Sequence, residues 1–259
     1  MSAGEDVLRR ERRGSTMLLT ITRPQRRNAM DNALIDAMRA AFLDCDRDPE
    51  VGAIVLNGTG PGFCAGSDLK YIGNLGLEEM CRFEQETGDV ARLIGFLSKP
   101  VVAAVEGFAM GGGFILATSC DVVVAGRSSR WSLPEVPIGW LTPWGIKSLV
   151  ARVGFVRARN LCFGLETLSG DEAVAAGVAD HAVEDGSALA SALAIADRLA
   201  ALPAPAVAST KRFFSRYIMA DSETMDVEAN RLFAENCREP VARATLAKFG
   251  RPALVPGPA

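Results

Sequence analysis

Residues 101–118 read VVAAVEGFAMGGGFILAT, a nearly uncharged stretch about as long as a membrane span. Glu106 and four glycines interrupt this stretch, and polar sequence flanks it on both sides. A buried strand that runs through a glycine-rich turn into a buried helix has the same composition. We therefore expect residues 101–118 to lie in the core of a globular protein and not in a membrane.

Strand and helix patterns alternate on either side of this stretch. Residues 17–22 (MLLTIT) and 53–57 (AIVLN) are short apolar runs typical of strands, and residues 31–44 between them have the spacing of an amphipathic helix that Asp31 can cap. Residues 121–125 form a further predicted strand. Strand, helix and strand in this order build parallel sheets, so we predict an α/β fold.

Helical patterns dominate after residue 144. Capping boxes, glycines and prolines delimit them, and the predicted helices span residues 145–152, 155–164, 169–177, 187–202, 207–219 and 224–249. We predict one core domain over residues 1–201 and a helical C-terminal region over residues 202–259.

The composition excludes several classes of protein. The chain has 259 residues, 49% of them hydrophobic, and its 28 Lys and Arg against 31 Asp and Glu give a net charge of −3, which argues against nucleic-acid binding. The six cysteines include no C-x-x-C pair, so we expect neither disulfides nor a metal site. The polar residues 1–16 lack the apolar run of a secretory signal, so we expect a cytoplasmic protein. His181, the single histidine, is expected on a strand edge.

Two glycine-rich turns are the first candidates for a functional site. One contains Phe63–Asp68 (FCAGSD) after the strand at 53–57, and the other contains Gly111–Gly113 after the strand at 101–106. Glycines allow the backbone to approach a ligand closely, and a helix that begins at such a turn has free N–H groups. Two turns at one edge of a parallel sheet could direct two N–H donors at one oxygen, as an oxyanion hole requires.

The order and spacing of these pieces resemble the crotonase (enoyl-CoA hydratase/isomerase) superfamily over nearly the whole chain. The matching pieces are Arg23-Pro24, Arg27-Asn28-Ala29, Phe63 to Asp68, Lys99 to Gly107, Gly111 to Gly113, Cys120-Asp121, Leu133-Pro134-Glu135 and Gly177-Val178. The resemblance implies a spiral of ββα turns, a C-terminal helical region that mediates trimerisation, and a homotrimer or homohexamer. It also implies a coenzyme A thioester as substrate, with no separate cofactor.

The resemblance also assigns roles to individual residues. The backbone N–H groups of Ser67 and Gly112 are expected to hold the thioester oxygen as it becomes an enolate, and Glu135 is expected to transfer protons. The expected substrate contacts are Ala65, Asp68, Lys70, Arg27, Ile115, Trp140 and Trp144, of which Arg27 and Lys70 would contact CoA phosphates. The tryptophans would line the acyl site. Lys211, Phe233 and Lys248 are further candidates near the nucleotide.

One departure from the family pattern bears on the reaction. Hydratases of this family use two glutamates, but the first of these positions, two residues after the glycine triplet, is Ile115 here, which cannot hold water or accept a proton. With Glu135 as a lone acid, the chain most resembles the enoyl-CoA isomerases. Hydration or lysis, acyl-CoA hydrolysis, and acyl-CoA binding without turnover remain alternatives.

Overall fold

The structure is a computed structural model that describes residues 7–250. The first six residues of the predicted core and the last nine of the predicted C-terminal region lie outside the described residues. The predicted boundary near residue 202 falls between two helices, and the division into two regions stays a prediction.

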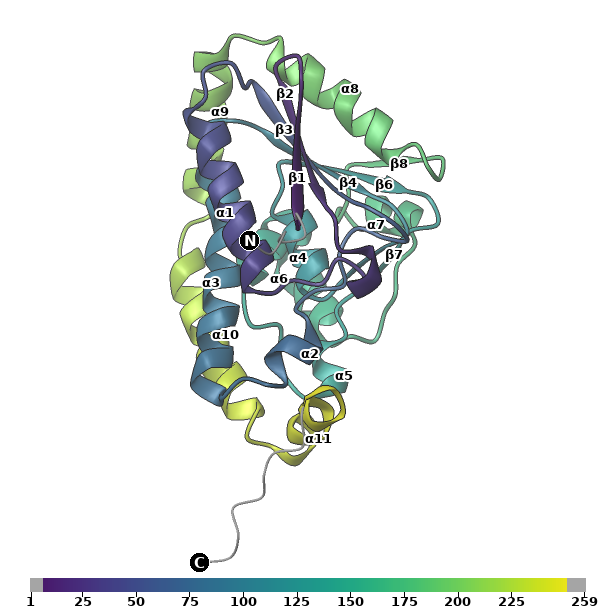
Figure 1. Cartoon of the computed structure of the whole chain (residues 1–259), viewed down its shortest axis with the longest axis vertical. Coiled ribbons are helices and arrows are strands. Elements are labelled where there is room, and N and C mark those ends of the chain that lie inside the picture. Colours follow the sequence, from purple (N-terminus) through teal and green to yellow (C-terminus); the bar gives the residue numbers. More distant parts are fainter. Residues whose placement is uncertain (1–6, 251–259) are drawn as a thin grey trace, which may run out of the picture.

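A six-stranded sheet forms the centre of the molecule (Figure 1). Its strands lie in the order β1, β2, β3, β4, β6, β8, and every neighbouring pair is parallel except β1 and β2. The strands are β1 (Leu8–Arg13), β2 (Thr16–Ile21), β3 (Ala53–Gly58), β4 (Val101–Val105), β6 (Val122–Gly126) and β8 (His181–Val183). The predicted α/β class is confirmed, and the exposed His181 lies on the edge strand as expected.

A second, two-stranded sheet lies beside the carboxyl ends of β4 and β6. It pairs β5 (Phe108–Met110) with β7 (Arg130–Ser132) in parallel. The chain passes from β4 to β5 and then into α4 (Gly112–Thr118), and again from β6 to β7 and then into α5 (Glu135–Ile138). This repeated path is the expected spiral of ββα turns. It brings the first residues of α4 and α5 to the same part of the molecule.

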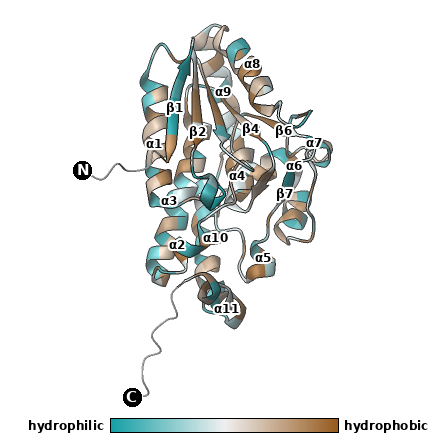
Figure 2. Cartoon of the chain, turned by 45° about the vertical axis from the view of Figure 1, so that its right-hand side comes forward, coloured by the Kyte–Doolittle hydropathy of each residue, from teal (hydrophilic) through white to brown (hydrophobic). Residues whose placement is uncertain are grey.

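Helices cover both faces of the large sheet (Figures 1 and 2). On one face, alanines at four-residue spacing on α8 (Ala188–Ala200) pack on Leu18, Val55, Val102 and Val124. The opposite face carries the main core, which includes buried side chains of the two long helices α1 (Asn32–Arg47) and α3 (Leu77–Phe96). The other helices are η1 (Pro24–Arg26), α2 (Leu69–Ile72), α6 (Ile146–Cys162), α7 (Gly170–Ala175), α9 (Ala204–Ile218), α10 (Ser222–Asn236) and α11 (Pro240–Phe249).

The structure differs from the predicted helices in several places, and two of the differences concern long segments. The helix predicted over 224–249 is two helices, because Pro240 lacks the N–H that would continue α10 and instead begins α11. The 20-residue helix α3 was not predicted. In the described part of the chain no single helix is long and apolar enough to cross a membrane; α8 and α9 meet that test only as a pair, across a bend of 109°.

Candidate active site

A small cavity of about 70 Å³ lies where α4, α5 and the loop after β3 meet. Its lining includes five of the predicted site residues besides Glu135. They are Ala65, Ser67, Gly112, Trp140 and Trp144. The lining also contains Glu84, which the sequence analysis did not single out. The ββα spiral therefore brings together residues that lie as much as 79 positions apart in the sequence.

The Ser67 N–H is free because of the way its neighbours pair with Met30. Met30 N donates to Gly66 O at 2.8 Å, and Asp68 N donates to Met30 O at 2.8 Å. In such a parallel bridge the N–H of the residue in between points away from Met30. Across residues 7–250 the hydrogen bonds include no acceptor for the Ser67 N–H.

The second expected donor, the Gly112 N–H, lies on the turn that contacts the Ser67 turn. Gly112 is the first residue of α4, and a first-turn N–H has no acceptor within its own helix. A Cβ atom added to Gly66 would lie only 2.9 Å from Gly112 N, so the two glycine-rich turns are in contact. Gly66 has φ of +89°, a conformation that favours glycine. The predicted pair of N–H donors is thus available at one side of the cavity.

Glu135 lies in the cavity with an unusual environment for a carboxylate. Its side chain is 6% exposed, and within the described structure its Oε2 has no hydrogen-bond partner. Burial raises the pKa of Glu135 to about 8, and the nearby charge of Glu84 adds to the effect. A carboxyl group whose pKa is near neutral can both release and accept a proton at neutral pH.

Glu84 is a second buried carboxyl group in the same cavity. It projects from α3, is 2% exposed, and its Oε2 accepts a hydrogen bond from Trp144 Nε1 at 2.7 Å. Burial raises the pKa of Glu84 to about 7, while hydrogen bonds from Trp144 and Ser67 lower it. The sequence carries one signal of this role, since Glu84 stands between Met80 and Gly88 on the buried stripe of α3, where an acidic residue is unusual.

The two tryptophans, Trp140 and Trp144, both line the cavity. Trp144 is 1% exposed, and a Cβ atom at Gly112 would lie 2.8 Å from its ring, so the indole lies against the backbone of the predicted oxyanion hole. Trp140 packs edge-to-face on Phe233 of α10, with ring centroids 5.9 Å apart. Phe233 is therefore a core contact behind the cavity.

The remaining predicted substrate contacts do not line the cavity. The carboxylate of Asp68 caps α2, accepting from the backbone N–H groups of Lys70 and Tyr71, and also accepts from Arg26 Nη1 at 2.9 Å. Its oxygens are thus occupied by protein groups. Arg27 lies over the ring of Phe108 at 4.6 Å, on the surface.

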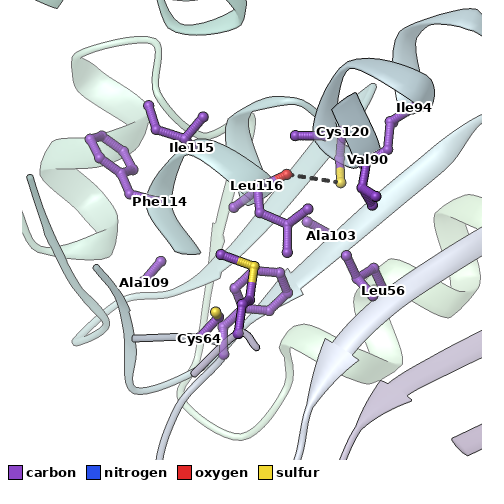
Figure 3. Close-up of a cluster of buried hydrophobic side chains, with 14 of the residues drawn as sticks. Leu56, Cys64, Val90, Ile94, Ala103, Ala109, Phe114, Ile115, Leu116 and Cys120 are labelled. Carbon is purple, nitrogen blue, oxygen red and sulfur yellow. Dashed lines mark hydrogen bonds between the residues drawn. The ribbon is translucent and has the colours of Figure 1, made fainter. Parts of the chain in front are cut away.

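Three further residues named from the sequence, Lys70, Ile115 and Lys211, also lie outside the cavity lining. Lys70 is exposed. Ile115 is fully buried in the main hydrophobic cluster (Figure 3), and a Cβ atom at Gly145 would lie 2.2 Å from its Cγ2. Lys211, a candidate for the nucleotide end of the substrate, is itself buried and forms an ion pair at 2.6 Å with Asp121.

Comparison with known proteins identifies the family of this chain. The family model described as enoyl-CoA hydratase/isomerase matches residues 11–248. A short-chain-enoyl-CoA hydratase of Clostridium acetobutylicum is 32% identical over 228 residues, 87% of each chain, and a crotonyl-CoA hydratase of Syntrophomonas wolfei is 31% identical over 224 residues, 85% of this chain and 86% of the relative.

Solved structures show the same fold. The crystal structure of an enoyl-CoA hydratase/isomerase from Mycobacterium paratuberculosis superposes with a TM-score of 0.87 at 23% identity, over 95% of this chain and 99% of that one. That of an enoyl-CoA hydratase from Mycobacterium avium subsp. paratuberculosis superposes with a TM-score of 0.82 at 27% identity, over 94% and 95%. The chain therefore belongs to the enoyl-CoA hydratase/isomerase family of enzymes, within the crotonase superfamily.

Proposed function

We propose that this enzyme transfers a proton at Cα of an enoyl-CoA thioester, with Glu135 as the acid and base. The N–H groups of Ser67 and Gly112 would hold the thioester oxygen while it carries the negative charge of the enolate. The observation that carries the proposal is the position of Glu135, a buried carboxyl group with a free oxygen, in the same cavity as these two N–H donors.

Two reactions of an enoyl-CoA use this chemistry. Isomerisation needs one group that takes a proton from Cα and returns it further along the chain, and Glu135 can do this alone. Hydration needs a second group for the water. The two relatives from Clostridium and Syntrophomonas are named hydratases, and the second carboxyl group in the cavity, Glu84, supports hydration as the other candidate.

Mass spectrometry with a panel of acyl-CoAs tests the proposal. With 3-enoyl-CoA, isomerisation gives a product of unchanged mass and a new retention time, whereas hydration of 2-enoyl-CoA adds the mass of one water molecule. Release of free CoA would indicate a hydrolase. Binding of every thioester with neither turnover nor exchange of the Cα proton would contradict the proposal and indicate an acyl-CoA-binding homologue.

We also propose that the C-terminal helices join copies of the chain as a trimer or hexamer. Supporting this, α9 exposes three adjacent aromatic rings, with 59% of Phe213, 54% of Phe214 and 61% of Tyr217 accessible. Exposed apolar patches of this kind mark contact surfaces. Light scattering of the wild-type chain and of a Phe213→Ser variant tests this, and a monomeric wild type would contradict it.

A further inference from the structure

We propose that Glu84 is a second catalytic carboxylate, and that it takes the proton of a water molecule that adds to Cβ of a 2-enoyl-CoA. This inference rests on the proposed function, because it assumes that Glu135 and the two N–H donors act at Cα and at the thioester oxygen. It assigns to a residue of α3 the role that Ile115, two residues after the glycine triplet, cannot fill.

Glu84 is held in place from two sides. Trp144 donates its indole N–H to Oε2 at 2.7 Å, and the Ser67 hydroxyl is a second hydrogen-bond partner. Trp144 lies directly against α3, since a Cβ atom at Gly88, one turn beyond Glu84, would be 2.7 Å from Trp144 Cβ. The carboxyl group therefore has a fixed position in the cavity wall.

The loop that carries Trp144 is anchored to the same helix through α10. Gly145 N donates to Asp226 Oδ1 at 2.7 Å, and Asp226 Oδ2 accepts from Arg92 of α3 at 2.7 Å. Asp226 and Arg92 are 3% and 13% exposed at their side chains. This buried connection fixes Trp144 relative to α3, and hence fixes its N–H relative to Glu84.

When two carboxyl groups share the hydration, the protons balance if the groups start in opposite states. The Glu84 carboxylate takes a proton from water as the water oxygen bonds to Cβ. The electron pair of the double bond moves toward the thioester, whose oxygen becomes the enolate held by the two N–H groups. Glu135, as a carboxylic acid, then gives its proton to Cα and the carbonyl reforms. Transfer of the new proton from Glu84 to Glu135 restores the starting state.

The environments of the two groups favour this distribution of protons. Glu84 receives hydrogen bonds that stabilise its ionised form, whereas Glu135 Oε2 has no partner in the described structure. Burial raises the pKa of both groups, to about 7 for Glu84 and to about 8 for Glu135. The hydrogen bonds from Trp144 and Ser67 act on Glu84, so Glu84 is the group of the pair that loses its proton more readily, as the addition of water needs.

The test separates the roles of the two glutamates with two assays. The first follows exchange of the Cα proton of butyryl-CoA in D₂O, which needs only the oxyanion hole and Glu135. The second follows hydration of crotonyl-CoA by mass. For Glu84→Gln we expect exchange at no less than about one third of the wild-type rate, with hydration lower by about 10²–10⁴-fold. Glu86→Gln, which removes the same charge from the same helix outside the cavity lining, is the matched control and should retain both.

Four results would overturn the inference while leaving the proposed function in place. They are wild-type exchange without hydration, full hydration in Glu84→Gln, equal loss of both activities in a folded Glu84→Gln, and loss of hydration in the control. Absence of exchange in the wild type would instead contradict the proposed function.

If Glu84→Gln does not fold, Trp144→Phe provides the test. This variant keeps the carboxyl group but removes one hydrogen bond that lowers its pKa, so the acid limb of the hydration profile should move to higher pH. An unchanged acid limb would overturn the inference.

Discussion

A Cβ atom on Gly111 would lie 2.7 Å from Oε1 of Glu135, closer than two such atoms can approach. The first glycine of the triplet therefore leaves the space that the carboxyl group of Glu135 occupies. Gly111 also has φ of +54° and its N–H donates to Ser132 O at 2.9 Å, which fixes the turn before α4. One residue thus connects the turn that carries the Gly112 donor with the position of the acid.

We expect Gly111→Ala to lower turnover by at least about 10²-fold, because the new methyl group displaces Glu135 and the turn is strained. Gly14→Ala is the matched control, since Gly14 has a similar φ of +59° but no atom near its Cβ position. Both variants should lose about 1–2 kcal/mol of stability from the left-handed backbone alone. Equal turnover in the two folded variants would show that Gly111 has no influence on Glu135.

Glu135→Gln keeps the shape of the side chain and removes its ability to give or take a proton. We expect turnover to fall by about 10²–10⁴-fold, with the affinity for a CoA thioester within a few-fold of wild type. Steady-state rates and calorimetric titration with a product analogue measure the two quantities. Wild-type turnover in this variant would exclude Glu135 as the acid and base.

Two substitutions at Ser67 separate its N–H from its hydroxyl. Ser67→Pro removes the N–H and should cost about 3 kcal/mol in the transition state. The sequence alone predicts a nearly silent Ser67→Ala. Because the hydroxyl lowers the pKa of Glu84 in the structure, we now expect Ser67→Ala to raise that pKa and move the acid limb of the rate profile to higher pH. A larger rate loss in Ser67→Ala than in Ser67→Pro would assign the chemistry to the hydroxyl.

The fold and half of the site were predictable from local patterns. Apolar runs at 53–57 and 101–106 gave β3 and β4 nearly to the residue, because strands buried on both faces are continuous in hydrophobicity. The glycine-rich turns after them predicted that two N–H donors could meet, the family resemblance identified the donors as Ser67 and Gly112, and the cavity lining contains both.

The second carboxyl group was not predictable in the same way. Glu84 follows no glycine-rich turn, and its place in the cavity depends on how α3 packs against the loop that carries Trp144.

The prediction that Asp68 contacts the substrate overlooked its local hydrogen bonds. Its position directly before α2 makes it a helix cap, and that local hydrogen bonding uses the oxygens that a ligand would need.

Ile115, two residues after the glycine triplet, gives a further prediction. The sequence suggests that Ile115→Glu would create a two-carboxylate hydratase, but Ile115 is fully buried against Gly145 and does not line the cavity. We expect this variant to lose several kcal/mol of stability and to gain no hydration. Ile115→Val, which should cost only about 0.5–1.5 kcal/mol, is the control. Thermal melts and the crotonyl-CoA assay decide, and a folded variant with faster hydration would show that position 115 reaches the substrate.

The raised pKa of Glu135 also predicts how stability depends on pH. Burial raises this pKa to about 8 in the folded chain from an ordinary value of 4.5, so between these values the folded state binds more protons than the unfolded state. The free energy of unfolding therefore decreases as pH rises from about 5 to 8. Glu135→Gln removes this contribution, so its melting temperature should match wild type near pH 5 and exceed it near pH 8, by about 2–4 °C for each kcal/mol. Glu84 still titrates in the Glu135→Gln variant, so some decrease of stability with rising pH should remain. The double variant Glu84→Gln/Glu135→Gln should show the smallest decrease.

Melting curves of the three proteins across this pH range measure the effect. A constant difference in melting temperature between wild type and Glu135→Gln would mean that Glu135 titrates at its ordinary value.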